Sequence, residues 1–532
     1  MSKASKSFVG GASVLAIAGL IGKIIGMFYR VWLTGLITTE GIALYGYPYS
    51  VYNFLLVISS AGLPTAISKM VSEQIAMGNM EGTHYILKKT RRILLCTGAV
   101  CTLVMALLAK PIAAEMGDAA AAPGFVALAP SIFFVCLLSS YRGYFQGMQN
   151  MTPTAISQLI ETCGKVIFGY FFVKEFSGYG LVWGAVGAII GVTLAELLAL
   201  LFIVFRFVFH KASLPRTNGS TTVTIPDFYM KLFGIAIPVT IGASMMPIVN
   251  LVDASLVVNR LSSIGYAVEE ARNAYGVLTG MVNTMVNMPA VVTLSFSMSL
   301  VPAISTAIAA KDRKGLQSTV STGLKLALMF GSAAAVGMGI LSKQILTMLY
   351  ASQTAESLAL GGKLLSVMSI GILFLSIVQT TTGMLQGLGK PGYPVKTLAV
   401  GVLFKIILNA VLIGIPSVNV MGAAYASVVC YGIAALGNVF MVLKLTKTRI
   451  NVGDGLVRPV LTAVGMATVV WAFVKFCPLQ LGNTMLTAAA VALGLLTYAV
   501  LVFVLRALNE NDWMMIPGGR KVLRLLGRGK RT

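Results

Sequence analysis

Long apolar runs alternate with short polar breaks along almost the whole 532-residue chain. A helix needs about 20 mainly apolar residues to cross the hydrocarbon core of a bilayer, and the runs suffice for about fourteen crossings. The expected spans are 9–37, 43–66, 93–113, 123–147, 154–174, 180–209, 229–259, 273–308, 322–348, 362–387, 394–414, 419–445, 456–477 and 483–507. This pattern predicts an all-α integral membrane protein.

Composition supports the same fold class. Hydrophobic residues make up 57% of the chain and charged residues only 11%, against roughly 25% charged in ordinary soluble domains. A soluble protein of this length needs more polar surface, so we expect lipid to cover the apolar exterior. The first apolar run contains Lys23 and Arg30 and shows no clear small-residue cleavage site, so we interpret it as a spanning helix and not as a cleaved signal peptide.

The formal net charge is +23, and the cations occur in short clusters between the spans. If the helices alternate in direction, these clusters share one side: Lys3, Lys6, Lys88, Lys89, Arg91, Arg92, Lys211, Arg216, Lys311, Arg313, Lys314, Lys447, Arg449 and the tail cations from Arg520 to Arg531. The positive-inside rule then predicts that both termini are cytoplasmic. No basic domain or aromatic-basic stripe is present, so we expect no nucleic-acid partner.

An internal repeat suggests two halves. Gly143-Tyr-Phe-Gln-Gly147 is echoed 240 residues later by Gly383-Met-Leu-Gln-Gly387, and Lys165 is echoed at the same offset by Lys405. A weaker echo relates Pro64–Ser68 to Pro302–Ser305. Duplicated halves are common in transporters. The expected organisation is a six-helix lobe (1–210), a linker (211–228), a second six-helix lobe (229–446), two extra helices (447–510) and a basic cytoplasmic tail (511–532).

Charged side chains inside spans are costly, so each is a candidate functional residue. Lys23 and Arg30 are seven residues apart and share one helix face. A cationic helix face suits an anionic headgroup, because guanidinium groups grip phosphate in a bidentate manner. The alternative is that both side chains extend to the interface. Arg142 is a third candidate for substrate binding, near the cytoplasmic end of its span.

Two further cations and two carboxylates lie within spans. Glu161 and Lys165 are an i,i+4 pair in the favourable order, either a self-neutralising pair or part of a polar cavity. Lys165 and its echo Lys405 are candidates for substrate binding. Glu196 has no neighbouring cation in sequence, so it must pair across helices or be protonated. We therefore place Glu161 and Glu196 among the candidates for ion coupling.

Asn250 and Asp253 are spaced i,i+3 and are expected to share a face, as a cation or proton site or as an interhelical hydrogen bond. No phosphate-binding loop, hydrolase or metalloprotease motif is evident, so we expect no enzyme, no resident cofactor and no metal site. Active transport would then be coupled to Na⁺, H⁺ or the membrane potential.

Three segments resemble the stage V sporulation protein B family, a polysaccharide flippase family of the MOP (MATE-like) superfamily that is related to the MurJ-type lipid II flippases. They are the stretches Gly22–Arg30, Gly62–Lys69 and Tyr141–Glu161, the last containing Arg-Gly-Tyr-Phe-Gln-Gly. The resemblance implies two pseudo-symmetric six-helix lobes around a central cavity with alternating access. It also implies a bacterial plasma-membrane flippase that moves an undecaprenyl-pyrophosphate-linked sugar, such as lipid II or a polysaccharide repeat unit, from the inner to the outer leaflet.

In the lipid II flippases, basic residues of the first helix line the cavity, and Lys23 and Arg30 match that helix. The pattern departs at Tyr29-Arg30, where those flippases have an Arg–Asp pair, and near Thr284, where they have an arginine. Three alternatives stay open: a MATE-like ion-coupled exporter of small molecules or drugs, an integral-membrane enzyme, and a scaffold that binds cell-wall synthesis proteins. The sequence does not fix the sugar, the coupling ion, the oligomeric state or a role in sporulation.

Overall fold

The structure is a computed structural model that describes residues 3–212, 225–449, 453–476, 482–509 and 512–513. Every regular element in this part of the chain is helical. Thirteen helical segments of the described chain are long and apolar enough to cross a bilayer. The predicted all-α integral membrane fold is therefore confirmed.

The chain divides by packing into two compact units, residues 1–280 and 281–532. The longer helices of the first unit are α1 (Lys3–Ser60), α2 (Gly62–Ala76), α3 (Met80–Leu107), α4 (Ala109–Glu115), α5 (Ala122–Gly147), α6 (Thr152–Phe176), α7 (Leu181–Ala212), α8 (Phe228–Ser263) and α9 (Val268–Gly276). Those of the second unit are α10 (Asn283–Ala309), α11 (Arg313–Ile340), α12 (Ser342–Leu349), α13 (Ala355–Gly387), α14 (Gly392–Leu412), α15 (Met421–Thr446), α16 (Arg458–Phe476) and α17 (Asn483–Val504).

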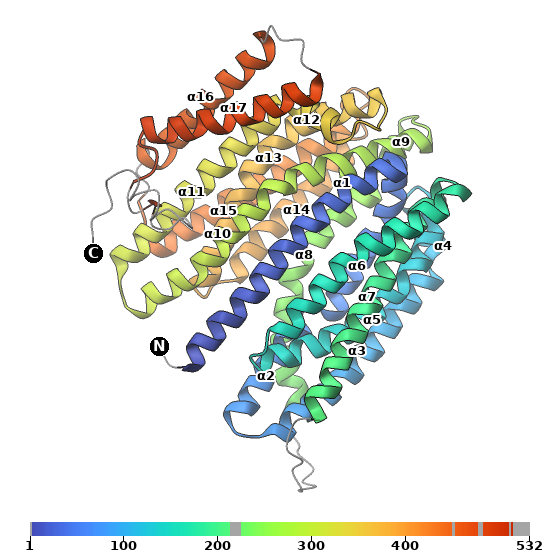
Figure 1. The fold of residues 1–532 in the computed structure, drawn as a ribbon, viewed down its shortest axis with the longest axis vertical. Coiled ribbons are helices and arrows are strands. Elements are labelled where there is room, and N and C mark those ends of the chain that lie inside the picture. Colours follow the sequence, from blue (N-terminus) through green and yellow to red (C-terminus); the bar gives the residue numbers. More distant parts are fainter. Residues whose placement is uncertain (1–2, 213–224, 450–452, 477–481, 510–511, 514–532) are drawn as a thin grey trace. The chain divides into compact units, whose positions relative to one another are not determined.

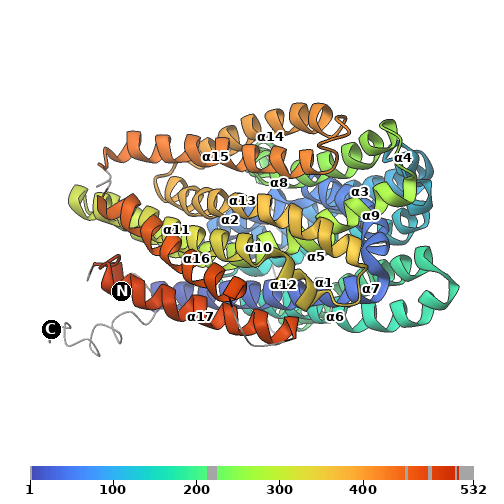
Figure 2. The same cartoon turned by 90° about the horizontal axis from the view of Figure 1, so that it is seen from above.

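Figure 1 shows α3, α5, α6 and α7 side by side within the first unit, and Figure 2 agrees. In the second unit α16 and α17 pair with each other and lie against α11 and α12. The boundary between the units falls at Gly280, so α8 and α9 pack with the first unit. The predicted lobes, which rest on the internal repeat, stay a prediction. Most of the predicted linker (213–224) and of the predicted tail (514–532) lies outside the described residues.

The first two predicted spans form one long element interrupted at a single residue. Thr38 has φ 62° and ψ 175° inside α1, a backbone conformation that a β-branched residue rarely adopts. The interruption separates the helical stretches 3–37 and 39–60. The first contains the predicted span 9–37, whereas the predicted span 43–66 runs past the end of α1 at Ser60 into α2. One non-helical residue therefore replaces the loop that the sequence suggests.

The basic cluster 88–92 lies inside α3, and the expectation that it belongs to a loop is wrong. α3 begins at Met80, where the Asn79 side chain accepts a hydrogen bond from Gly82 N at 2.9 Å. Such a cap satisfies a free backbone donor and starts the helix well before the apolar stretch. Hydropathy marks the part of a helix that suits lipid, but helical hydrogen bonding continues into the polar residues beside it.

The echoed glycine motif packs in the same way in both units. In the first unit, a Cβ added at Gly143 would lie 2.8 Å from Pro64 O, and Ser72 Oγ donates to Gly147 O at 2.8 Å. In the second unit, a Cβ at Gly383 would lie 2.6 Å from Ser297 O, and Ser305 Oγ donates to Gly387 O at 3.1 Å. Small residues let helix backbones approach closely in membranes. The repeat thus specifies one recurring helix contact, α2 with α5 and α10 with α13.

α9 packs closely against α1 at Gly276. A Cβ at this position would lie 1.8 Å from Thr39 O, and the backbone cannot yield as a flexible side chain does. We expect Gly276→Ala to destabilise the protein by about 1–3 kcal/mol, the usual cost of overpacking, and to lower the Tm in detergent. Gly234→Ala is the matched control, because nothing lies within 4 Å of its added Cβ. An unchanged Tm for Gly276→Ala would contradict this packing.

A charged network inside the first helical unit

Close packing of α6 against α7 brings two intramembrane charges together. A Cβ at Gly164 would lie 2.9 Å from Ala195 Cβ, so the two helices touch at this level. The next residue on each helix is charged, and Lys165 Nζ lies 3.3 Å from Glu196 Oε1. The partner that Glu196 lacks in sequence is therefore supplied by a neighbouring helix.

Lys165 is shared between two carboxylates. Its Nζ also lies 2.8 Å from Glu161 Oε1, one turn earlier on α6. Glu161 in turn accepts a hydrogen bond from Arg142 of α5, with Nη2 3.0 Å from Oε2. Arg142 Nε donates to Ser157 Oγ at 2.9 Å. Arg142, Glu161, Lys165 and Glu196 thus form one continuous ion-pair network, named here the α5–α7 network.

A tyrosine of α1 joins this network. Tyr52 OH donates to Glu196 Oε1 at 2.7 Å. Its ring lies 5.5 Å from that of Tyr49, which stacks on Tyr45 at 5.3 Å between centroids. Arg30 Cζ lies 5.1 Å from the centroid of the Tyr45 ring, a cation–π distance. A row of aromatic rings therefore runs from Arg30 to the α5–α7 network.

The α5–α7 network is charge-balanced and largely buried. It contains two cations and two carboxylates, and the Glu196 side chain is fully buried. Glu196 Oε2 has no hydrogen-bond partner among the described residues. An ion pair in an apolar interior tolerates loss of one partner poorly, because the remaining charge stays desolvated. The arrangement can hold the three helices together.

The other candidate residues lie outside this network. Lys23 is exposed on α1, and Arg30 is half-buried against Tyr45. Among the described residues, no carboxylate lies within ion-pair distance of either. On α8, Asn250 is exposed, whereas Asp253 is buried. The i,i+3 spacing therefore does not give the two side chains the same environment.

Lys405 lies in the second unit. It is almost fully buried on α14, and Asn409, one turn further on, is fully buried. In the described part of the chain, no group of three or more His, Cys, Asp or Glu side chains is arranged to hold a metal ion. The roles assigned to all nine candidate residues stay predictions.

Sequence reasoning missed the tyrosines. Tyr45, Tyr49 and Tyr52 are spaced i, i+4 and i+7, which places them on one helix face. With Tyr47, four tyrosines occur in a stretch of eight residues inside an apolar span, and this density could have marked them as candidate site residues. Ser157 carried no comparable signal, because serine is common in membrane helices as a local hydrogen-bonding residue.

The fold defines the class, a multi-pass membrane protein with the architecture of MOP-superfamily transporters. A solved structure described as the lipid II flippase MurJ in an inward closed conformation superposes with a TM-score of 0.70. It is 17% identical and covers 92% of this chain and 98% of its own.

The family described as polysaccharide biosynthesis protein matches residues 8–308, and the MatE family matches residues 278–411. The chain belongs to the polysaccharide biosynthesis protein family. It is 27% identical to stage V sporulation protein B of Bacillus subtilis, over 98% of this chain and 100% of the relative. It is also 27% identical to the lipid II flippase MurJ of Bacillus subtilis, over 83% of each chain. The predicted family and superfamily are therefore confirmed.

Proposed function

We propose that this protein is a flippase that moves an undecaprenyl-pyrophosphate-linked sugar, such as lipid II or a polysaccharide repeat unit, from the inner to the outer leaflet. Its relatives include a protein named for lipid II flipping. The observation that carries the proposal is the pair Lys23 and Arg30, intramembrane cations that no described carboxylate neutralises. Unneutralised cations at membrane depth are costly unless a ligand or a water-filled cavity compensates them.

A pyrophosphate linkage is a suitable compensating ligand. Its oxygens accept several hydrogen bonds, and a guanidinium fork binds two of them at once. The Arg30 guanidinium lies near the Tyr45 ring, and a guanidinium beside an aromatic ring can still donate hydrogen bonds to phosphate oxygens. Lys23, seven residues earlier on the same face, adds a second positive charge. Arg142 and Lys165 are already paired with Glu161, so in this proposal they act when that network rearranges.

The α5–α7 network is the proposed coupling element. In one arrangement Lys165 pairs with both Glu161 and Glu196, and Arg142 supplies the second positive charge. In the alternate arrangement Lys165 withdraws toward the anionic substrate, and a proton or Na⁺ compensates the carboxylates. Glu196 Oε2, buried and without a described partner, is the oxygen we assign to that cation. Asp253 and Asn250 of α8 are second candidates for cation binding.

The same proposal places both termini in the cytoplasm of a bacterium and treats the protein as a transporter without catalytic chemistry. The basic clusters support the cytoplasmic orientation of the termini, because loops rich in lysine and arginine stay on the cytoplasmic side. A complex with cell-wall synthesis proteins fits this role, because a flippase delivers the substrate that those enzymes use.

A MATE-like exporter of small molecules is the second candidate, favoured by the MatE match over residues 278–411. The two candidate functions predict different effects when this protein is depleted from cells. We expect depletion of this protein to slow translocation of lipid-linked precursors in membrane vesicles and to leave resistance to cationic drugs unchanged. Loss of drug resistance with normal precursor translocation would favour the exporter.

A further inference from the structure

One end of the second unit carries exposed cations from several helices. Ser305 Oγ donates to Gly387 O at 3.1 Å, which joins the ends of α10 and α13. Gln317 Nε2 donates to Lys447 O at 3.1 Å, which joins the start of α11 to the end of α15. Leu316, Tyr393 and Leu443 pack around one core cluster at the same level. The exposed cations of these joined ends are Lys311, Arg313, Lys314, Lys390, Lys396, Lys444, Lys447, Arg449 and Arg506.

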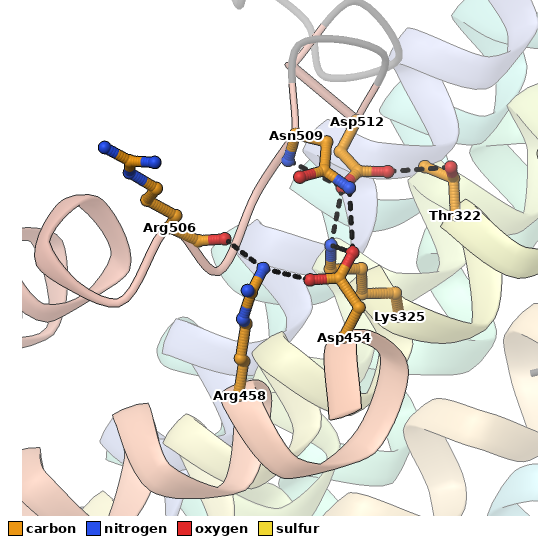
Figure 3. Close-up of polar contacts among 7 residues, drawn as sticks. All are labelled: Thr322, Lys325, Asp454, Arg458, Arg506, Asn509 and Asp512. Atoms are coloured by element: carbon orange, nitrogen blue, oxygen red, sulfur yellow. Dashed lines mark hydrogen bonds and ion pairs between the residues drawn. The ribbon is translucent and has the colours of Figure 1, made fainter. Parts of the chain in front are cut away.

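The described acidic side chains at this end form hydrogen bonds or ion pairs with nearby residues. Asp312 caps α11, with its side chain accepting from Gly315 N at 2.9 Å. Asp454 and Asp512 belong to a compact cluster with Lys325 of α11 (Figure 3). We name this cluster, which also includes Thr322, Arg458 and Asn509, the C-terminal clasp.

In the C-terminal clasp, Lys325 is the buried centre. Its Nζ lies 2.8 Å from Asp512 Oδ2 and 3.4 Å from Asp454 Oδ2. Thr322 Oγ1 donates to Asp512 Oδ1 at 2.7 Å, and Asn509 N donates to Asp512 Oδ2 at 2.8 Å. Arg458 pairs with Asp454 one turn earlier. Both carboxylates are therefore satisfied within the clasp and do not neutralise the surrounding cations.

Arg506 shows most clearly that the exposed cations are separate from the carboxylates of the C-terminal clasp. Its main-chain carbonyl accepts from Arg458 Nη1 at 3.2 Å. Its guanidinium points away from the clasp in Figure 3 and is exposed. The exposed cations of the described part of this end therefore outnumber its acids, and Asp454 and Asp512 are paired within the clasp.

We propose that this end of the second unit is a docking surface for anionic phospholipid headgroups, kept cationic because the C-terminal clasp sequesters the nearby carboxylates. Clusters of lysine and arginine next to spanning helices attract anionic lipid within about one Debye length. Tyrosine and tryptophan are enriched at the membrane–water interface. At this end of the unit, Lys396 lies over the Tyr393 ring, and Trp513 stacks on Phe503. The inference concerns lipid recognition and is independent of the transported cargo.

The test uses the full-length protein in nanodiscs of phosphatidylcholine alone or of phosphatidylcholine with phosphatidylglycerol in equal parts. We expect phosphatidylglycerol to raise the Tm of the wild type by several degrees, and raised NaCl to remove that shift. The triple variants Lys311→Gln/Arg313→Gln/Lys314→Gln and Lys444→Gln/Lys447→Gln/Arg449→Gln should each lose at least half of the shift. The matched control is Lys343→Gln/Lys363→Gln/Lys475→Gln, which removes three exposed cations from the opposite end of the same unit and should keep it.

Native mass spectrometry provides a second measurement that does not depend on stability. The wild type and the control should retain phosphatidylglycerol in preference to phosphatidylcholine, and both triple variants should show a weaker preference. Equal retention in all four proteins, or an equal Tm shift, would overturn the proposal. A Tm shift of the same size from inorganic phosphate in phosphatidylcholine nanodiscs would overturn the assignment to lipid headgroups.

Discussion

Replacing Lys165 with methionine is expected to abolish transport and to destabilise the first helical unit strongly. The ammonium group is shared by Glu161 at 2.8 Å and Glu196 at 3.3 Å. Without it, the buried Glu196 keeps the hydrogen bond from Tyr52 but loses its ion pair. Removal of one partner from a buried pair typically costs about 3–5 kcal/mol. Thermal unfolding in detergent and transport in proteoliposomes measure the two effects separately.

The control and the rescue lie on the same helices. Lys174→Met removes an exposed lysine of α6 and should change neither measurement. Lys165→Met/Glu196→Gln removes the uncompensated charge as well as its partner, so it should recover much of the lost stability while transport stays absent. This double-mutant cycle separates a coupling role from a structural one. Full stability and full transport in Lys165→Met would refute both roles.

Replacing Arg30 with alanine is expected to weaken binding of a pyrophosphate-linked lipid by about 10- to 100-fold, since a hydrogen bond to a charged group contributes about 1.5–3 kcal/mol. Arg30→Lys keeps the charge and loses the planar fork, so it should recover only part of the affinity. Lys23→Ala should also weaken binding. Titration of native lipid-linked precursor into purified protein measures these affinities.

Arg92→Ala, which removes an exposed arginine from α3, is the control for general loss of positive charge and should bind normally. The Tm of Arg30→Ala should fall little, because Arg30 makes no ion pair with the described residues and its printed side-chain contact is the one with the Tyr45 ring. Normal binding and transport in Lys23→Ala/Arg30→Ala would remove α1 from the substrate site.

The spans were predictable because lipid imposes a simple rule on every crossing segment. α5 and α6 begin and end within two residues of the predicted spans 123–147 and 154–174. The long N-terminal extension of α3 and the interruption at Thr38 were not predictable. The first depends on a cap at Asn79, and the second depends on one backbone conformation that hydropathy does not encode.

The candidate site was predictable only where sequence spacing fixes geometry. The i,i+4 spacing of Glu161 and Lys165 gave their ion pair directly. Arg142 and Glu196 join this ion pair only because of the way α5, α6 and α7 pack, and a single sequence does not reveal that packing. Asn250 and Asp253 show the converse, because their environments differ although their spacing predicts a common face.

One measurement tests the proposed function most directly: translocation of a fluorescent undecaprenyl-pyrophosphate-linked sugar in proteoliposomes that contain the purified protein. Label in the outer leaflet is quenched by dithionite, and the rate at which protected label becomes accessible reports flipping. The proposed function predicts a rate above that of protein-free liposomes, abolished in Lys165→Met and strongly reduced in Lys23→Ala/Arg30→Ala. A rate equal to that of protein-free liposomes, with uptake of a small cationic dye by the same vesicles, would contradict it.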